Sequence, residues 1–186
     1  MTREELEHII RASADITGQY EFIIVSSQSI LGPVPNPNPV FTMSAEADIY
    51  PLQAPELADQ IDGAIGEGSQ FHETNGYYAQ GVGPDTAVLP HGRFQRVHRV
   101  QNDNTNGRLG LCLNVADLFM SKAAAGREKD RDFCQALLQH AYVTPAEVLG
   151  LVPDMPMNDW ERRRLRATIR RWAKSLRDAG HNIPEV

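Results

Sequence analysis

The sequence predicts a mixed α/β (α+β) protein, in which helices flank a mixed sheet and a helical extension follows at the C-terminus. Short apolar, β-branched segments alternate with helix-like segments in the first part of the chain, whereas the pattern from Val115 onward is helical. A length of 186 residues, with 41% hydrophobic and 23% charged residues, suits one folded domain with a short appendage. We therefore expect a main domain over residues 1–142 and a helical extension over 143–186.

The elements expected up to residue 65 follow from local signals. Thr2 and Glu5 have the spacing of a capping box, and the apolar residues after them predict a helix to about Ala14. The β-branched segment 21–25 predicts a buried strand. Four prolines between positions 33 and 39 predict a loop, because proline lacks a backbone N–H donor. After this loop we expect a strand over 44–50 and a helix that begins after Pro55 and contains Leu57, Ile61 and Ile65.

Short strands and then helices are expected in the rest of the chain. Gly, Pro and Asn clusters separate the expected strands, which lie near residues 77–80, 94–100 and 109–113. Gly126 separates two helical segments, 117–125 and 128–140. Thr144 and Glu147 form a second capping-box pattern, which predicts the start of another helix.

Positive charge is concentrated near the C-terminus of a chain whose net charge is −6. Residues 159–178 hold eight basic and three acidic residues, and apolar residues recur among them at helical spacing. One interpretation is an amphipathic helix that packs its apolar stripe on an acidic body. The other is a contact surface for RNA or for a partner protein. The acidic remainder of the chain argues against extended, non-specific DNA binding.

The sequence also bears on compartment and on cysteine chemistry. The longest strongly apolar run, residues 22–25, is far shorter than the roughly 20 residues that cross a bilayer. The acidic N-terminus lacks the pattern of a secretory signal, so we expect a cytoplasmic protein without a membrane partner. Cys112 and Cys134 are too few for a disulfide framework, and we expect buried free thiols.

An acidic pair, Glu46 and Asp48, lies in the strand expected over residues 44–50. Alternate side chains of a strand share a face, so these carboxylates are expected about 6–7 Å apart along the chain. Magnesium binds through one or two carboxylates together with substrate phosphates, and such a pair suits nucleotide chemistry. The alternative is an ordinary solvated strand face.

The segment from Phe22 to Asp48 resembles the DNA polymerase beta-like nucleotidyltransferase superfamily, in which an apolar strand, a Gly-Ser turn and an acid-x-Asp pair follow one another. The turn here is Val25-Ser26-Ser27-Gln28, and Ser44-Ala-Glu-Ala-Asp48 is similar to the Ser-x-Asp-x-Asp form of the abortive-infection branch. That branch includes toxins of toxin–antitoxin pairs. The resemblance covers about residues 5–140 and extends to uncharacterised bacterial proteins of the superfamily. The downstream basic and acidic residues of that branch have similar counterparts here in Lys122, Arg127 and Asp130.

This resemblance implies transfer of a nucleotidyl group from a nucleoside triphosphate (NTP) to a hydroxyl of RNA or protein. Glu46 and Asp48 would hold Mg²⁺ or Mn²⁺, and Ser26 and Ser27 would hold the triphosphate. Lys122 would place its positive charge beside a phosphate group of the NTP. Arg127 would donate hydrogen bonds, with Asp130 either orienting it or acting as a base. The alternative for these last three residues is an ordinary charged helix face.

Three positions depart from the superfamily pattern. Ser26 replaces the usual glycine, and Glu46 replaces the commoner aspartate. Gln80 stands where active relatives often have a third carboxylate, and an amide cannot act as an anionic base. Glu73 or Asp85 is a candidate to compensate for it. The alternative function is therefore a catalytically degenerate protein that binds a nucleotide or a partner, since a fold by itself does not establish chemistry.

Overall fold

The computed structural model describes residues 1–185 and confirms the mixed α/β class. Two compact units are defined by their internal packing. Unit 1 consists of Met1–Thr86 and Arg96–Asn114, and unit 2 consists of Ala87–Gln95 and Val115–Val186. These units reflect packing alone, and the division into 1–142 and 143–186 suggested by the sequence pattern stays a prediction.

Unit 1 is built on a mixed five-stranded sheet with the strand order β3-β2-β1-β5-β4. The central strand β1 pairs antiparallel with β2 and parallel with β5. The outer pairs are β2 with β3, which is parallel, and β4 with β5, which is antiparallel. The strand bounds are β1 Glu21–Ile24, β2 Glu46–Pro51, β3 Tyr78–Gly81, β4 His98–Val100 and β5 Leu109–Cys112.

Helix α1, Arg3–Thr17, packs its apolar face on this sheet. The expected capping box is present, because the Thr2 side chain accepts from the Glu5 N–H and the Glu5 side chain accepts from the Thr2 N–H. The helix runs three residues past the expected end and stops at Gly18, whose φ of 68° is left-handed. A Cβ on Gly110 of β5 would lie only 2.5 Å from the Ile10 side chain, so glycine permits this close contact.

The remaining helices of unit 1 are short. The expected helix after Pro55 is a 3₁₀ turn, Pro55–Leu57, followed by α2, Ala58–Ile65. The chain after β1 forms a 3₁₀ helix, Ser27–Leu31, and the proline-rich loop beyond it contains only the 3₁₀ turn Pro39–Phe41. Helix α3, Gln70–Asn75, follows α2. A further 3₁₀ turn, Pro84–Thr86, ends the first segment of unit 1.

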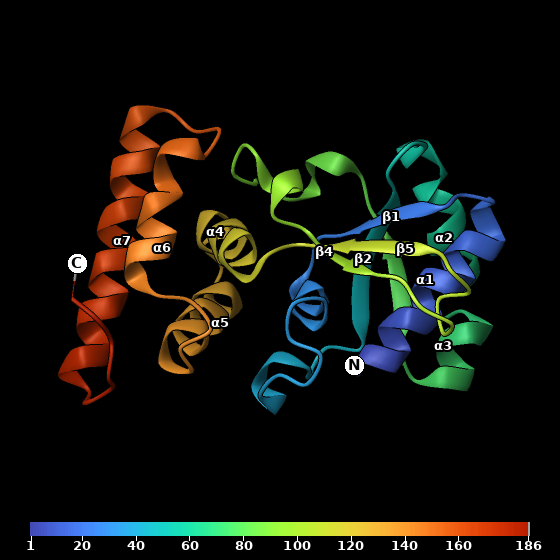
Figure 1. Ribbon diagram of the computed structural model, residues 1–186, viewed down its shortest axis with the longest axis horizontal. Helices are drawn as coiled ribbons and strands as arrows, with labels where there is room; N and C mark the ends of the chain where they lie inside the picture. The colour runs from blue at the N-terminus through green and yellow to red at the C-terminus, as the bar shows by residue number, and fades with distance from the viewer. Residues whose placement is uncertain (186) are drawn as a thin grey trace. The chain divides into compact units, whose positions relative to one another are not determined.

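The secondary structure of the described residues of unit 2 consists of helices joined by loops, and Figure 1 shows α4–α7 in yellow to red. Asn158 caps α7 through a capping box with Glu161, and α7 buries an apolar stripe that includes Ile169 and Trp172. The Trp172 ring packs edge-on against Phe119 of α4, with ring centroids 6.3 Å apart. The amphipathic C-terminal helix is thus confirmed. The helices are α4 Val115–Ala125, α5 Glu128–Gln139, α6 Pro145–Gly150 and α7 Asp159–Asp178, with 3₁₀ turns at Arg93–Gln95 and Val152–Asp154.

Three further expectations can be compared with the structure. The strand expected near 94–100 is wrong over its first half, because Arg93–Gln95 is a 3₁₀ turn and only His98–Val100 pairs in the sheet. Cys112 and Cys134 are free and buried, as expected, and burial raises the pKa of each thiol. Among residues 1–185, no helix combines the length and apolar character needed to cross a membrane.

Candidate functional site

Glu46 and Asp48 occupy one face of β2. Burial alternates along the start of this strand: Glu46 and Asp48 are half-buried, whereas Ala47 and Ile49 are buried. This period of two is the pattern of a strand with one more accessible face, and it places both carboxylates on that face. The strand begins at Glu46, two residues later than expected.

The turn after β1 lies directly beside Asp48. The Ser26 hydroxyl oxygen accepts a hydrogen bond from the Asp48 N–H at 3.2 Å, and the Val25 N–H donates to the Asp48 carbonyl at 3.1 Å. Ser26 has φ −90° and ψ −171°, which is extended backbone that any residue adopts. The local backbone therefore does not require the glycine that the superfamily usually has there. Ser27 follows as the first residue of the 3₁₀ helix.

Tyr78 hydrogen-bonds to one carboxylate oxygen of the acidic pair. The parallel pairing of β2 with β3 sets Tyr78 opposite Glu46, and the phenolic O–H donates to Glu46 Oε2 at 2.9 Å. Burial, together with the hydrogen bond and charge of Glu46, raises the pKa of Tyr78 to about 12. The phenol therefore stays protonated at neutral pH and remains a donor. Sequence reasoning missed this role, because it depends on a pairing between strands that are far apart in the chain.

Gln80 lies opposite Asp48 in the same β2–β3 register. The position beside the acidic pair on the neighbouring strand is therefore an amide. Glu73 lies in α3 and Asp85 lies in a 3₁₀ turn; both are exposed, and neither is part of β3. Within residues 1–185, no group of three or more His, Cys, Asp or Glu is placed to hold a metal ion. A site here would have two carboxylates, which fits the usual protein share of magnesium ligands.

Lys122, Arg127 and Asp130 form an ion cluster within unit 2. Asp130, in the first turn of α5, is fully buried. Its carboxylate accepts from Arg127 Nε at 2.6 Å and lies 3.3 Å from Lys122 Nζ, which α4 contributes from its last turn. The Lys122 side chain is 14% exposed and that of Arg127 is 61% exposed. One buried carboxylate thus joins two cations, and the cluster carries a net charge of +1.

Electrostatics keep Asp130 ionised. Burial alone would raise the pKa of this carboxyl group, but the hydrogen bond from Arg127 and the positive charge of Lys122 outweigh it and hold the pKa below its ordinary value. A carboxylate with a lowered pKa and two cationic partners is a weak proton acceptor. Of the two roles considered for Asp130, the geometry favours orientation of Arg127 and Lys122.

The candidate residues therefore fall into two local groups. Glu46, Asp48 and Ser26 come together in unit 1, with Tyr78 as an addition that the sequence did not indicate. The second group is the ion cluster of unit 2. Comparison of the chain with protein-family models, with curated proteins and with solved structures gives no match. The relation to nucleotidyltransferases therefore remains a resemblance of sequence motifs.

Proposed function

We propose that this protein is a metal-dependent nucleotidyltransferase that moves a nucleotidyl group from an NTP to a hydroxyl of RNA or protein, as a cytoplasmic component of a toxin–antitoxin system. The observation that carries the proposal is the contact between the serine turn and the acidic strand. Ser26 hydrogen-bonds to the backbone of Asp48, and Glu46 shares the accessible face of β2. A turn whose hydroxyls can hold phosphate, beside a carboxylate pair that can hold a metal, supports NTP-dependent transfer.

Glu46 and Asp48 would hold Mg²⁺ or Mn²⁺. The bound ion supplies positive charge to the phosphate oxygens of the NTP. Tyr78 orients Glu46 by occupying one of its oxygens, so that the other carboxylate oxygen remains available as a ligand. This outer hydrogen bond fixes a side chain that has one more rotatable bond than the commoner aspartate.

The serine turn would contact the triphosphate. The Ser26 oxygen accepts from Asp48 N–H and can still donate its own hydrogen to a phosphate oxygen, since a hydroxyl is both donor and acceptor. Ser27 is half-buried and carries a second hydroxyl beside it. As the resemblance implies, we assign Lys122 and Arg127 to phosphate contacts and Asp130 to their orientation.

A transfer assay tests the proposal. Purified full-length protein is incubated with Mg²⁺, each radiolabelled NTP, and total RNA or total protein as acceptor. Labelling of an acceptor is expected, and both Glu46→Gln and Asp48→Asn should abolish it, because each removes one negative metal ligand and keeps the side-chain volume. Glu56→Gln removes an exposed carboxylate of unit 1, in the turn beyond the far end of β2, and is the matched control. Labelling that survives both site substitutions would contradict the metal role.

Gln80 favours a second candidate function. An amide opposite Asp48 supplies no anionic base, which suits a degenerate nucleotidyltransferase-like protein that binds a nucleotide or a partner protein. Titration calorimetry with NTP and Mg²⁺ separates the two. Binding without transfer to any acceptor supports the binding module, and the basic helix α7 is then the candidate partner surface. Absence of both binding and transfer contradicts nucleotide chemistry altogether.

A further inference from the structure

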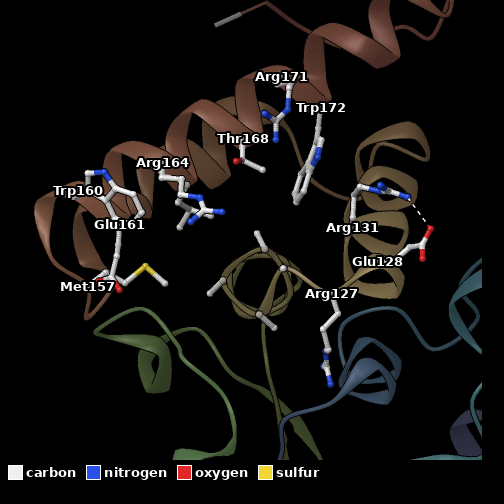
Figure 2. A pocket seen from close by; sticks show the side chains of 15 residues that line it. Arg127, Glu128, Arg131, Met157, Trp160, Glu161, Arg164, Thr168, Arg171 and Trp172 are labelled. Carbon is white, nitrogen blue, oxygen red and sulfur yellow. Dashed lines mark ion pairs between the residues drawn. The ribbon is translucent and has the colours of Figure 1, made fainter.

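Unit 2 contains a cavity of about 650 Å³ between α7, the end of α4 and the start of α5 (Figure 2). This volume lies within the range of roughly 300–1,000 Å³ that is usual for ligand pockets. Helix α7 contributes seven of the lining residues, and four of them, one aromatic, two basic and one hydroxyl-bearing, recur every three or four positions. We call Trp160, Arg164, Thr168 and Arg171 the α7 ladder.

The ladder flanks the buried stripe of α7 and is presented to the cavity. Figure 2 shows Arg164 and Thr168 extending from α7 toward the cavity. Two arginines seven residues apart lie two helical turns apart, or about 10 Å along the axis. Thr168 lies between the two arginines along this face of the helix. Arg127 also borders the cavity, but its side chain extends away from α7 and binds Asp130.

The positive charge of the ladder is not neutralised within the described residues. Arg171 makes no hydrogen bond or ion pair with any of residues 1–185, and Arg164 has only a cation–π contact, 5.5 Å from the centre of the Trp160 ring. Neither acidic residue at the cavity has a hydrogen bond or ion pair with a ladder arginine. The Glu161 carboxylate accepts from the N-cap N–H of α7, and Glu128 lies 3.5 Å from Arg131. The two ladder guanidinium groups therefore keep their donors for a ligand.

Trp160 is the exposed aromatic residue of this surface. It is 61% exposed, whereas Trp172, the other tryptophan at the cavity, is 6% exposed and packs against Phe119. Trp172 therefore has a structural role in the helical core. An exposed indole can stack on a nucleobase, and base–aromatic stacking tolerates any base because every base has a π face.

We propose that the α7 ladder binds a single-stranded polynucleotide, with a base stacked on Trp160 and phosphates bound by Arg164 and Arg171. The planar guanidinium group matches phosphate geometry, and a hydroxyl such as that of Thr168 is a common additional phosphate donor. Stacking on Trp160 requires a base that has left its own stack, which favours a single strand over a duplex. Because the argument uses unit 2 alone and needs neither a metal nor an NTP, it goes beyond the proposed transfer activity and can be tested separately from it.

The experiment measures fluorescence anisotropy of labelled single-stranded RNA and DNA of one mixed sequence with the full-length protein, without NTP or Mg²⁺. Wild-type protein should bind, and its affinity should fall with salt. Arg164→Ala and Arg171→Ala should each reduce the slope of log affinity against log salt by about 0.7, the contribution of one phosphate contact in a single strand. Trp160→Ala should weaken binding at least about fivefold through lost stacking.

Arg170→Ala is the matched control. Arg170 is exposed on the same helix, carries the same charge and does not line the cavity, so its loss should change the affinity by less than about twofold in salt that screens distant charges. Preference for RNA or for DNA supports the proposal and identifies the sugar. The proposal is overturned by absence of binding at low salt, by equal losses in Arg170→Ala and the two ladder variants, or by equally tight binding of a duplex. Unchanged thermal unfolding of each variant confirms that the fold is intact.

Discussion

Tyr78 donates its phenolic hydrogen to Glu46 across the β2–β3 pair, and a hydroxyl on one strand thereby fixes a carboxylate on the next. Tyr78→Phe removes this donor and keeps the ring, which lies 4.6 Å from the His72 ring. We expect the free energy of unfolding to fall by about 1 kcal/mol, the net value of a hydrogen bond. On the proposed metal role, Mg²⁺ affinity should also fall, because Glu46 loses its orientation. Urea unfolding and calorimetry measure the two effects.

Tyr77→Phe is the control for this prediction. The Tyr77→Phe substitution also removes a hydrogen bond, the one between the Tyr77 hydroxyl and His8 Nδ1 at 2.7 Å. That bond does not involve the acidic pair. The two variants should therefore lose similar stability, and only Tyr78→Phe should change Mg²⁺ affinity. Equal changes in Mg²⁺ affinity in Tyr78→Phe and Tyr77→Phe would contradict the proposal that Tyr78 positions Glu46.

Gln80→Glu should strengthen metal binding. The substitution places a third carboxylate opposite Asp48, at an exposed position where the cost of burying charge is absent. We expect Mg²⁺ affinity to rise several-fold and any transfer rate to rise with it. Gln139→Glu, an exposed glutamine at the end of α5 in unit 2, adds the same charge elsewhere and should change neither. Equal gains in both variants would indicate a general charge effect.

Asp130→Asn should destabilise the protein by about 3 kcal/mol, the lower end of the cost of breaking a buried ion pair. The amide removes the negative charge that balances Lys122, whose side chain is only 14% exposed. Asp132→Asn on the same helix is the control and should cost less than about 0.5 kcal/mol, because Asp132 is exposed. Chemical unfolding at neutral pH measures both. Equal stability of the two variants would contradict a structural role for the ion cluster.

Protonation of Asp130 makes the free energy of unfolding depend on pH, and the direction of this dependence follows from the pKa. The folded pKa of Asp130 is lowered, so its contribution to stability is fully present above the unfolded pKa and is lost as the pH falls through the folded pKa. The difference in unfolding free energy between wild type and Asp130→Asn should therefore be constant near neutrality and shrink in strong acid. A difference that grows on acidification would contradict the assignment.

Two glycine substitutions should have opposite effects. Gly110→Ala forces a Cβ to within 2.5 Å of the Ile10 side chain and should cost about 1–3 kcal/mol through overpacking between α1 and β5. Gly63→Ala, within α2, meets no atom within 4 Å and should stabilise the protein by about 0.5–1 kcal/mol through helix propensity. Thermal unfolding compares them, and stabilisation by Gly110→Ala would contradict the close packing of α1 on the sheet.

Local signals predict the elements well, because their causes are local. The capping boxes of Thr2 with Glu5 and of Thr144 with Glu147 are present, and each involves residues three apart. The pairing of Arg127 with Asp130 has the same short range, and Lys122 joins them across the turn at Gly126, whose φ is 67°. The three residues are expected from the resemblance to the abortive-infection branch, and the contacts that join them have the short range of helix spacing.

The neighbours of the acidic pair cannot be predicted in this way. The position of Tyr78 beside Glu46, and that of Gln80 beside Asp48, depends on parallel pairing between strands 32 residues apart, which no local pattern determines. The prediction around residue 94 is wrong for a related reason. Phe94 suggests a strand, but sheet pairing begins only at His98, and the preceding segment packs as a 3₁₀ turn of the other unit.

The assignment of Ala87–Gln95 to unit 2 has a consequence for fragment design. This segment precedes the last two strands of unit 1 in the chain, yet its His91 N–H donates to the Asp154 carbonyl at 2.9 Å. A fragment that begins at Val115 would therefore lack an N-terminal piece that belongs to the helical part, and the Asp154 carbonyl would lose its donor. Expression trials on the helical part alone would do better with residues 87–95 fused ahead of Val115 through a flexible linker.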